Sequence, residues 1–117
     1  MAKAIMFQGT ASSVGKSTMT AALCRILRRE GLRVAPFKAQ NMSAAAVDIG
    51  GGLRISAVQA VQAQAAGLAP TVDMNPLVLL PASEVSSEVI LLGRSLGVLS
   101  WGQYAVERRQ AVLEAVQ

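Results

Sequence analysis

The residues of this sequence that are best suited to chemistry form one short run, Gly15-Lys16-Ser17-Thr18. An apolar segment over residues 4–8 and a loop of small residues precede the run, and apolar side chains at helical spacing follow it. Backbone N–H groups at the beginning of a helix converge on phosphate oxygens, and a lysine adds positive charge over the outer phosphates. The hydroxyl after the lysine can ligate magnesium. This succession of strand, loop and helix predicts a phosphate-binding loop.

Two glycines frame the predicted loop. The strict pattern has four residues between its glycines, whereas five residues separate Gly9 from Gly15, so the sequence is a variant of that pattern. We expect contacts with phosphates along the loop and in the first turn of the helix. The residues expected to make them are Gly9, Thr10, Ser13, Val14, Gly15, Lys16, Ser17 and Thr18.

Lys38 is a second candidate for contact with phosphate. It directly follows residues 33–37, which are predicted as a second strand, so that strand, loop, helix and strand form one βαβ unit. In a parallel sheet the carboxyl ends of neighbouring strands share one crevice, in which ligands bind. We therefore expect Lys38 and Lys16 to face the same site.

Apolar spacing, capping residues and turn residues predict the remaining elements. The predicted elements are helices over residues 16–30, 53–66 and 101–116 and extended segments over 77–80 and 89–92. Gly31 and Gly67 are natural stops for the first two helices, and Ser100 is the expected N-cap of the third. Cys24 lies in the apolar pattern of the first helix and is predicted to be an inert core thiol.

Composition excludes several classes of protein and site. The 117 residues suffice for one modest domain, and a chain that is 52% hydrophobic and 15% charged is not intrinsically disordered. Such an apolar chain is expected to be part of a larger domain. The absence of histidine excludes Ser-His-Asp triads and Cys-His dyads, and a single cysteine excludes Cys/His zinc sites.

Charge and hydropathy indicate which classes of partner to expect. The net charge of +4 is scattered and aromatic residues make up 3%, so we expect no binding to nucleic acid. No apolar run reaches the roughly 20 residues of a membrane span, and the first residues do not form a signal peptide. We therefore expect a cytoplasmic protein that does not contact membranes.

Several runs of residues match a known family. They are Gln8-Gly9-Thr10-Ala11-Ser12-Ser13-Val14-Gly15-Lys16-Ser17, Ala35-Pro36-Phe37-Lys38-Ala39-Gln40-Asn41-Met42-Ser43, Ala60-Val61-Gln62-Ala63, Ala65-Ala66-Gly67 and Val72-Asp73-Met74-Asn75-Pro76. Together they closely resemble the amino-terminal end of the cobyric acid synthase family. The resemblance runs through nearly the whole chain and weakens after Pro76.

The resemblance implies a fold and an activity. The fold is an α/β fold of the P-loop NTPase type, a mostly parallel sheet with flanking helices, here incomplete relative to the full domain. The family is an ATP-dependent, glutamine-hydrolysing amidotransferase of cobalamin (vitamin B12) biosynthesis. It converts carboxylates of adenosylcobyrinic acid a,c-diamide to amides, with ATP activating each carboxylate as an acyl phosphate that ammonia attacks. Residues 1–117 would be the N-terminal portion of its ATP-binding synthetase domain.

The resemblance also implies roles for individual residues. Gly15, Lys16 and Ser17 would bind the ATP phosphates, and Ser17 would also hold Mg²⁺. Lys38 would be the catalytic residue, stabilising charge on the transferred phosphoryl group or on the substrate carboxylate. The residues that would face the corrinoid substrate are Gln40, Asn41 and Ser43.

The sequence departs from the family pattern at several charged or polar positions. Arg54 stands at an acidic position, Ala57 at an arginine position, and Leu80 where a lysine precedes Pro81. Residues 44–46 are alanines in place of Leu-Asn-Ser. Because a glutaminase needs a histidine and later strands of the ATP-binding sheet are missing, we expect this chain to be inactive alone.

Two alternative functions stay open. One is a non-catalytic nucleotide-binding module similar to the ParA/MinD ATPases, although Thr10 and Ala11 lie where those proteins carry a signature lysine. The other is a ligase similar to dethiobiotin synthetase, in which Ala57 would replace a magnesium-binding aspartate. The expected partners are ATP and the corrinoid, together with the remaining synthetase or glutaminase part or a second copy of the chain.

Overall fold

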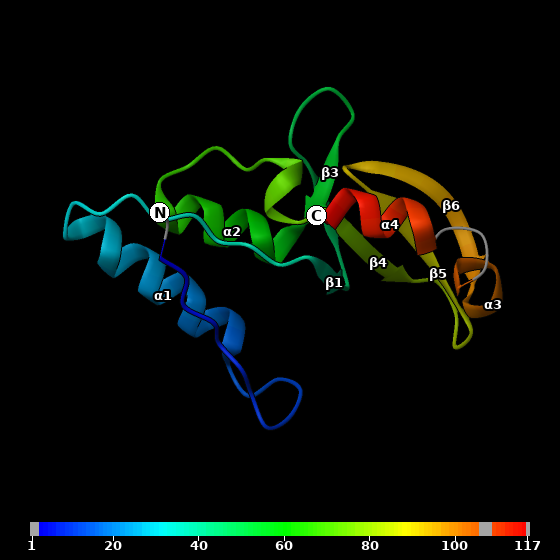
Figure 1. Cartoon of the computed structure of the whole chain (residues 1–117), viewed down its shortest axis with the longest axis horizontal. Coiled ribbons are helices and arrows are strands. Elements are labelled where there is room, and N and C mark those ends of the chain that lie inside the picture. The colour runs from blue at the N-terminus through cyan, green and yellow to red at the C-terminus, as the bar shows by residue number, and fades with distance from the viewer. Residues whose placement is uncertain (1–2, 106–108, 117) are drawn as a thin grey trace.

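The structure, a computed structural model, describes residues 3–105 and 109–116 (Figure 1). In chain order its elements are α1 (Lys16–Arg29), β1 (Gln40–Met42), β2 (Ala46–Asp48), β3 (Arg54–Ser56), α2 (Ala57–Ala66), the 3-10 helix η1 (Val72–Met74), β4 (Leu77–Pro81), β5 (Ser86–Leu91), β6 (Arg94–Ser100), α3 (Trp101–Gln103) and α4 (Arg109–Val116). Helices lie before, between and after two groups of three strands, and the predicted α/β class is confirmed.

The main sheet is mixed. Its strand order is β1-β4-β5-β6, and β1 pairs with β4 in parallel, with Gln40 opposite Leu77 and Met42 opposite Leu79. The pairs β4–β5 and β5–β6 are antiparallel, and β2 and β3 form a separate antiparallel hairpin. The extended segments predicted over 77–80 and 89–92 are confirmed in β4 and β5, whereas β6 and the small hairpin were not predicted.

The strands predicted over residues 4–8 and 33–37 are not formed. A strand needs a neighbour for its N–H and C=O groups, and neither segment pairs with a strand among the described residues. Ile5 is 68% exposed and Phe37 63%. The parallel pairing instead begins at Gln40, where β1 lies beside the edge of β4.

Two of the predicted helices form with adjusted bounds. α1 begins at Lys16 as expected and ends at Arg29, one residue before the predicted end at residue 30. α2 begins at residue 57 because the preceding residues Arg54–Ser56 pair with β2 as β3. Gly67, with φ 72°, ends α2 in the left-handed conformation that glycine adopts at little cost.

The structure describes two parts of the helix predicted over 101–116, namely α3 and α4. The Ser100 hydroxyl accepts from the N–H of Gln103, and the Gln103 side chain accepts from the N–H of Ser100, so the predicted cap is confirmed as a capping box at α3. α4 begins at residue 109, and residues 106–108 lie outside the described residues. In the described part of the chain no helix combines the length and the apolar character needed to cross a membrane.

Two apolar clusters hold the molecule together. Leu77, Leu79 and Val89 form one on the main sheet, against which Val112 of α4 packs. Cys24 joins α1 to the end of α2, where it meets Ala65 and Ala66. Cys24 is 3% exposed, which confirms a core position, and burial raises the pKa of its thiol.

Candidate phosphate-binding site

The candidate phosphate-binding loop, residues 9–15, turns sharply into α1. Ser13 has φ 57° and Gly15 has φ 102°, so two left-handed residues direct the chain into the helix. Gly15 is the N-cap and supplies no side-chain hydrogen bond. The first intrahelical bond runs from the N–H of Met19 to the carbonyl of Gly15, at 3.0 Å. The N–H groups of residues 16–18 therefore have no acceptor among the described residues, as expected for the first turn of a helix.

Lys16 folds back over this loop. Its Nζ donates to the carbonyl oxygen of Ala11 at 2.8 Å. A Cβ on Gly9 would lie 2.9 Å from both Cδ and Nζ of Lys16 and 2.7 Å from Cγ2 of Val14, so a larger residue at this position would make these side chains shift. The loop thus holds one ammonium group and leads into three unpaired amides at the positive end of a helix, which are features of an anion-binding site.

Ser17 is attached to α2 through its main chain. Gln62 Nε2 donates to the carbonyl oxygen of Ser17 at 3.1 Å, while the Ser17 residue itself is exposed. Gln62 is 7% exposed. Sequence reasoning gave no role to Gln62, and the available signal was a pair of glutamines three residues apart, Gln59 and Gln62, on an alanine-rich helix.

Lys38 lies two residues before β1 and is exposed. Its N–H donates to the carbonyl of Met74 at 2.9 Å, and its carbonyl accepts from Asn75 Nδ2 at 2.9 Å. The Lys38 ammonium has no acceptor among the described residues. Its main chain is therefore fixed on both sides while its charge is available to a ligand.

We expected parallel strands to bring Lys16 and Lys38 to one site. In the structure, helix α2 connects the two segments that carry these lysines. Asn75 Oδ1 accepts from the N–H of Ser56, the N-cap of α2, at 3.3 Å. Lys38 is thus tied to the beginning of α2, and Ser17 is tied to Gln62 on the same helix. The two contact points on α2, Ser56 and Gln62, are six residues apart, which corresponds to a rise of about 9 Å along the helix, so α2 connects both lysine-bearing segments. That the two side chains meet one ligand stays a prediction.

The three residues predicted to face a corrinoid differ in accessibility. Gln40 is exposed at the beginning of β1, whereas Asn41 is 5% exposed within that strand. The Ser43 hydroxyl donates to the carbonyl of Ala45 at 2.8 Å and accepts from the Ser56 hydroxyl at 3.0 Å. Asn41 and Ser43 are buried, so Gln40 presents the most accessible side chain of the three.

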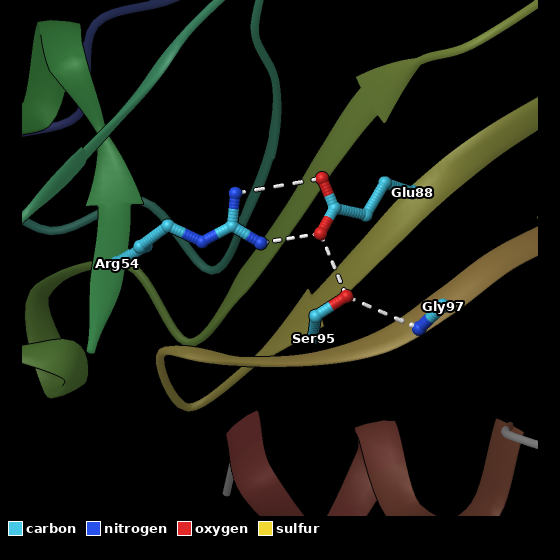
Figure 2. Close-up of polar contacts among 4 residues, drawn as sticks. All are labelled: Arg54, Glu88, Ser95 and Gly97. Carbon is cyan, nitrogen blue, oxygen red and sulfur yellow. Dashed lines mark hydrogen bonds and ion pairs between the residues drawn. The ribbon is translucent and has the colours of Figure 1, made fainter. Parts of the chain in front are cut away.

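Arg54 belongs to a separate ion-pair network (Figure 2). Its guanidinium donates to both carboxylate oxygens of Glu88, and the Ser95 hydroxyl donates to the same carboxylate at 2.6 Å. The hydrogen bonds from Arg54 and then Ser95 lower the pKa of Glu88 below its ordinary value. Arg54 therefore pairs with Glu88 and links β3 to β5, at a position where the resemblance led us to expect an acidic residue.

The described residues contain no group of three or more His, Cys, Asp or Glu that could hold a metal ion. The carboxylate of Asp48, at the end of β2, accepts a hydrogen bond from the N–H of Gly50 at 2.6 Å. Mg²⁺ usually keeps several waters and is bound through one or two protein ligands together with phosphate oxygens.

Comparison with known proteins identifies clear relatives. The chain matches the family described as CobQ/CobB/MinD/ParA nucleotide binding domain over residues 5–116. A cobyric acid synthase of Carboxydothermus hydrogenoformans is 52% identical over 118 residues, which cover 100% of this chain and 24% of that protein. A probable cobyric acid synthase of Methanothermobacter thermautotrophicus is 48% identical over 116 residues, 99% of this chain and 23% of its own length.

A further relative is the adenosylcobalamin biosynthesis bifunctional protein CobDQ of Leptospira interrogans, 51% identical over 100 residues, 86% of this chain and 12% of its own. No solved structure matches the chain. The similarity to cobyric acid synthases is confirmed, and the chain spans about a quarter or less of the length of these relatives.

Proposed function

Because the chain belongs to the CobQ/CobB/MinD/ParA nucleotide binding domain family, we propose that its loop at residues 9–15 and the first turn of α1 bind the triphosphate of ATP. The observation that carries the proposal is the Lys16 ammonium bound to the loop carbonyl of Ala11, together with the unpaired amides of residues 16–18. Phosphate oxygens would supply acceptors for these amides. They would also bind the ammonium more strongly than the neutral carbonyl of Ala11 does.

The contacts are assigned along the chain. The residues proposed to contact the nucleotide are Gly9, Thr10, Ser13, Val14, Gly15, Lys16, Ser17 and Thr18. Mg²⁺ would be held by the exposed Ser17 hydroxyl together with phosphate oxygens, and it would neutralise phosphate charge when bound. The donor set fits this ion because its remaining ligands can be phosphate and water rather than protein carboxylates.

The reaction we propose follows that of the cobyric acid synthases that the chain resembles. A carboxylate is a poor electrophile, and transfer of the γ-phosphoryl group to a corrinoid carboxylate supplies a leaving group that ammonia displaces. Lys38 is the catalytic residue, and its ammonium would stabilise charge on the transferred phosphoryl group. Gln40 would contact the corrinoid, while the buried Asn41 and Ser43 would shape the segment that carries it.

We propose that the partner of this chain is the remaining part of the synthase. Apolar side chains are exposed on both unpaired segments and on the outer side of α1, with Ile5 68%, Met6 79%, Phe37 63%, Met19 56% and Ile26 54% exposed. Added strands would pair residues 4–8 and 33–37 and cover the helix. Self-association would cover the same side chains. Light scattering separates the two possibilities, because it measures the mass of the particles formed by the chain alone and by the chain mixed with the remaining part of the synthase.

Calorimetric titration with Mg²⁺ and ATP tests nucleotide binding. The wild-type chain should bind ATP, and Lys16→Ala should weaken binding about tenfold or more, since a charge-assisted hydrogen bond contributes about 1.5–3 kcal/mol. Arg25→Ala is a matched control, because it removes an exposed cation from the same helix. Equal affinities for wild type and Lys16→Ala would show that the loop is not the site.

A non-catalytic module is the second candidate. The matching family includes MinD and ParA in its description, and the exposed apolar surface offers an area for association. In this case ATP would raise the mass of the chain in light scattering, whereas the synthetase proposal needs no such change.

A further inference from the structure

Asn75 is a completely buried polar residue between η1 and β4. It is 0% exposed, and its side-chain amide joins three segments that are distant in the sequence. Nδ2 donates to the carbonyl of Lys38 at 2.9 Å and to the carbonyl of Leu77 at 3.3 Å, while Oδ1 accepts from the N–H of Ser56 at 3.3 Å. Both N–H donors of the amide and one lone pair of its oxygen are thus used.

These bonds fix the position of Lys38 relative to α2. Without Asn75, the carbonyl of Lys38 would lose its partner, and the remaining restraint on that residue would be its own N–H bond to Met74. The lysine side chain has four rotatable methylenes, so the point that its ammonium reaches depends on where its main chain is held. A displacement of about 1 Å in a charge-stabilising group is costly to catalysis.

We propose that Asn75 is a positioning residue for Lys38. It holds the main chain of Lys38 at the beginning of α2. The Lys38 ammonium then reaches the outermost phosphate of a nucleotide bound at the first turn of α1, which α2 contacts through Gln62. The inference rests on the proposed function of Lys38. Asn75 touches no ligand itself, and it acts through the two carbonyl groups and the N–H that it binds.

The ratio of ATP affinity to ADP affinity separates positioning from general support of the fold. Removing a buried hydrogen-bonded side chain destabilises the protein and lowers the folded fraction. The apparent affinity for any ligand falls with that fraction, but it falls equally for ATP and ADP, so their ratio does not change. The ratio changes when the contact with the third phosphate is lost.

The experiment measures both affinities by calorimetry, in the presence of Mg²⁺, for the 117-residue chain and its variants. The variants are Lys38→Ala, Asn75→Ala, Asn75→Ser, the double variant Lys38→Ala with Asn75→Ala, and Val78→Ala. Val78 is 0% exposed in β4, so Val78→Ala is a matched control that destabilises the same sheet without touching Lys38. Asn75→Ser keeps a small hydroxyl and serves if the alanine variant does not fold.

The expected result is a fall of about tenfold in the ratio for Lys38→Ala and a smaller fall for Asn75→Ala or Asn75→Ser. The double variant should match Lys38→Ala, and Val78→Ala should keep the wild-type ratio. If Lys38→Ala leaves the ratio unchanged, the proposed role of Lys38 is wrong and the inference falls with it. If Lys38→Ala lowers the ratio and the Asn75 variants do not, or if their effects add in the double variant, the role of Lys38 stands and that of Asn75 is overturned.

Discussion

Gln62 on α2 donates a hydrogen bond to the carbonyl oxygen of Ser17, in the first turn of α1, across 3.1 Å. The two helices also meet at Cys24 and Ala65, so residue numbers increase along both in the same direction. α2 therefore runs beside α1 and supports the turn that presents the unpaired amides (Figure 1). The turn that follows the candidate phosphate-binding loop is thus held by a side chain that is not part of the loop.

Substitution of Gln62 should weaken the loop without removing any group that contacts phosphate. Gln62→Leu keeps the volume and loses the donor, which should destabilise the chain by about 1 kcal/mol and lower ATP affinity several-fold. Denaturant unfolding and calorimetry measure the two effects. Gln64→Leu, at an exposed position of the same helix, is the control. ATP affinity that is equal in wild type and Gln62→Leu would show that this contact does not support the loop.

Gly9→Ala should reduce ATP affinity more than stability. The added methyl group would press on the Val14 and Lys16 side chains, so we expect the lysine to be displaced from its position over the loop. The loop is exposed, and the free energy of unfolding should change little. Gly102→Ala adds a methyl group with nothing within 4 Å and should bind ATP as wild type does. Wild-type affinity in Gly9→Ala would mean that the position of Lys16 over the loop is not needed for binding.

The end of α2 offers a test of close packing. Gly67 has φ 72°, and a Cβ there would collide with the guanidinium of Arg28 from α1. Gly67→Ala should destabilise the chain by about 1–2 kcal/mol, through the left-handed conformation and the displaced arginine. In the Arg28→Ala background the same substitution should cost less in thermal or denaturant unfolding. An equal cost in both backgrounds would assign the whole effect to the backbone of Gly67.

Local signals in the sequence predicted the helices well. The glycines after α1 and α2 and the capping Ser100 act on neighbouring residues, so a single stretch of sequence contains what determines each helix end. The candidate phosphate-binding loop could be proposed for the same reason, since Gly15, Lys16 and Ser17 are consecutive, and phosphate binding by this loop stays a prediction.

The strands and the polar network could not be predicted in this way. Residues 4–8 have the composition of a strand, but pairing needs a neighbour that no local pattern supplies. The β2–β3 hairpin displaced four residues of the predicted second helix because Asp48 pairs with Arg54 across a turn of three glycines. Asn75 bonds to Lys38, which is 37 positions away in the sequence, and to Ser56, which is 19 positions away. These contacts become visible only in the folded chain.

The pH dependence of stability should report the ion pair shown in Figure 2. Glu88 has its pKa lowered in the folded chain by hydrogen bonds from Arg54 and Ser95, so folding favours the charged carboxylate. The pair therefore stabilises the fold above the unfolded pKa of about 4.3, and this contribution is lost as the pH falls through the lower folded pKa. The difference in denaturant midpoint between wild type and Arg54→Met should thus be largest near neutral pH and shrink in acid. Ser87→Ala, on the same strand, is the control, and its denaturant midpoint should follow that of wild type at every pH. A difference in midpoint between wild type and Arg54→Met that stays constant from pH 7 into acid would show that Arg54 acts through packing instead of charge.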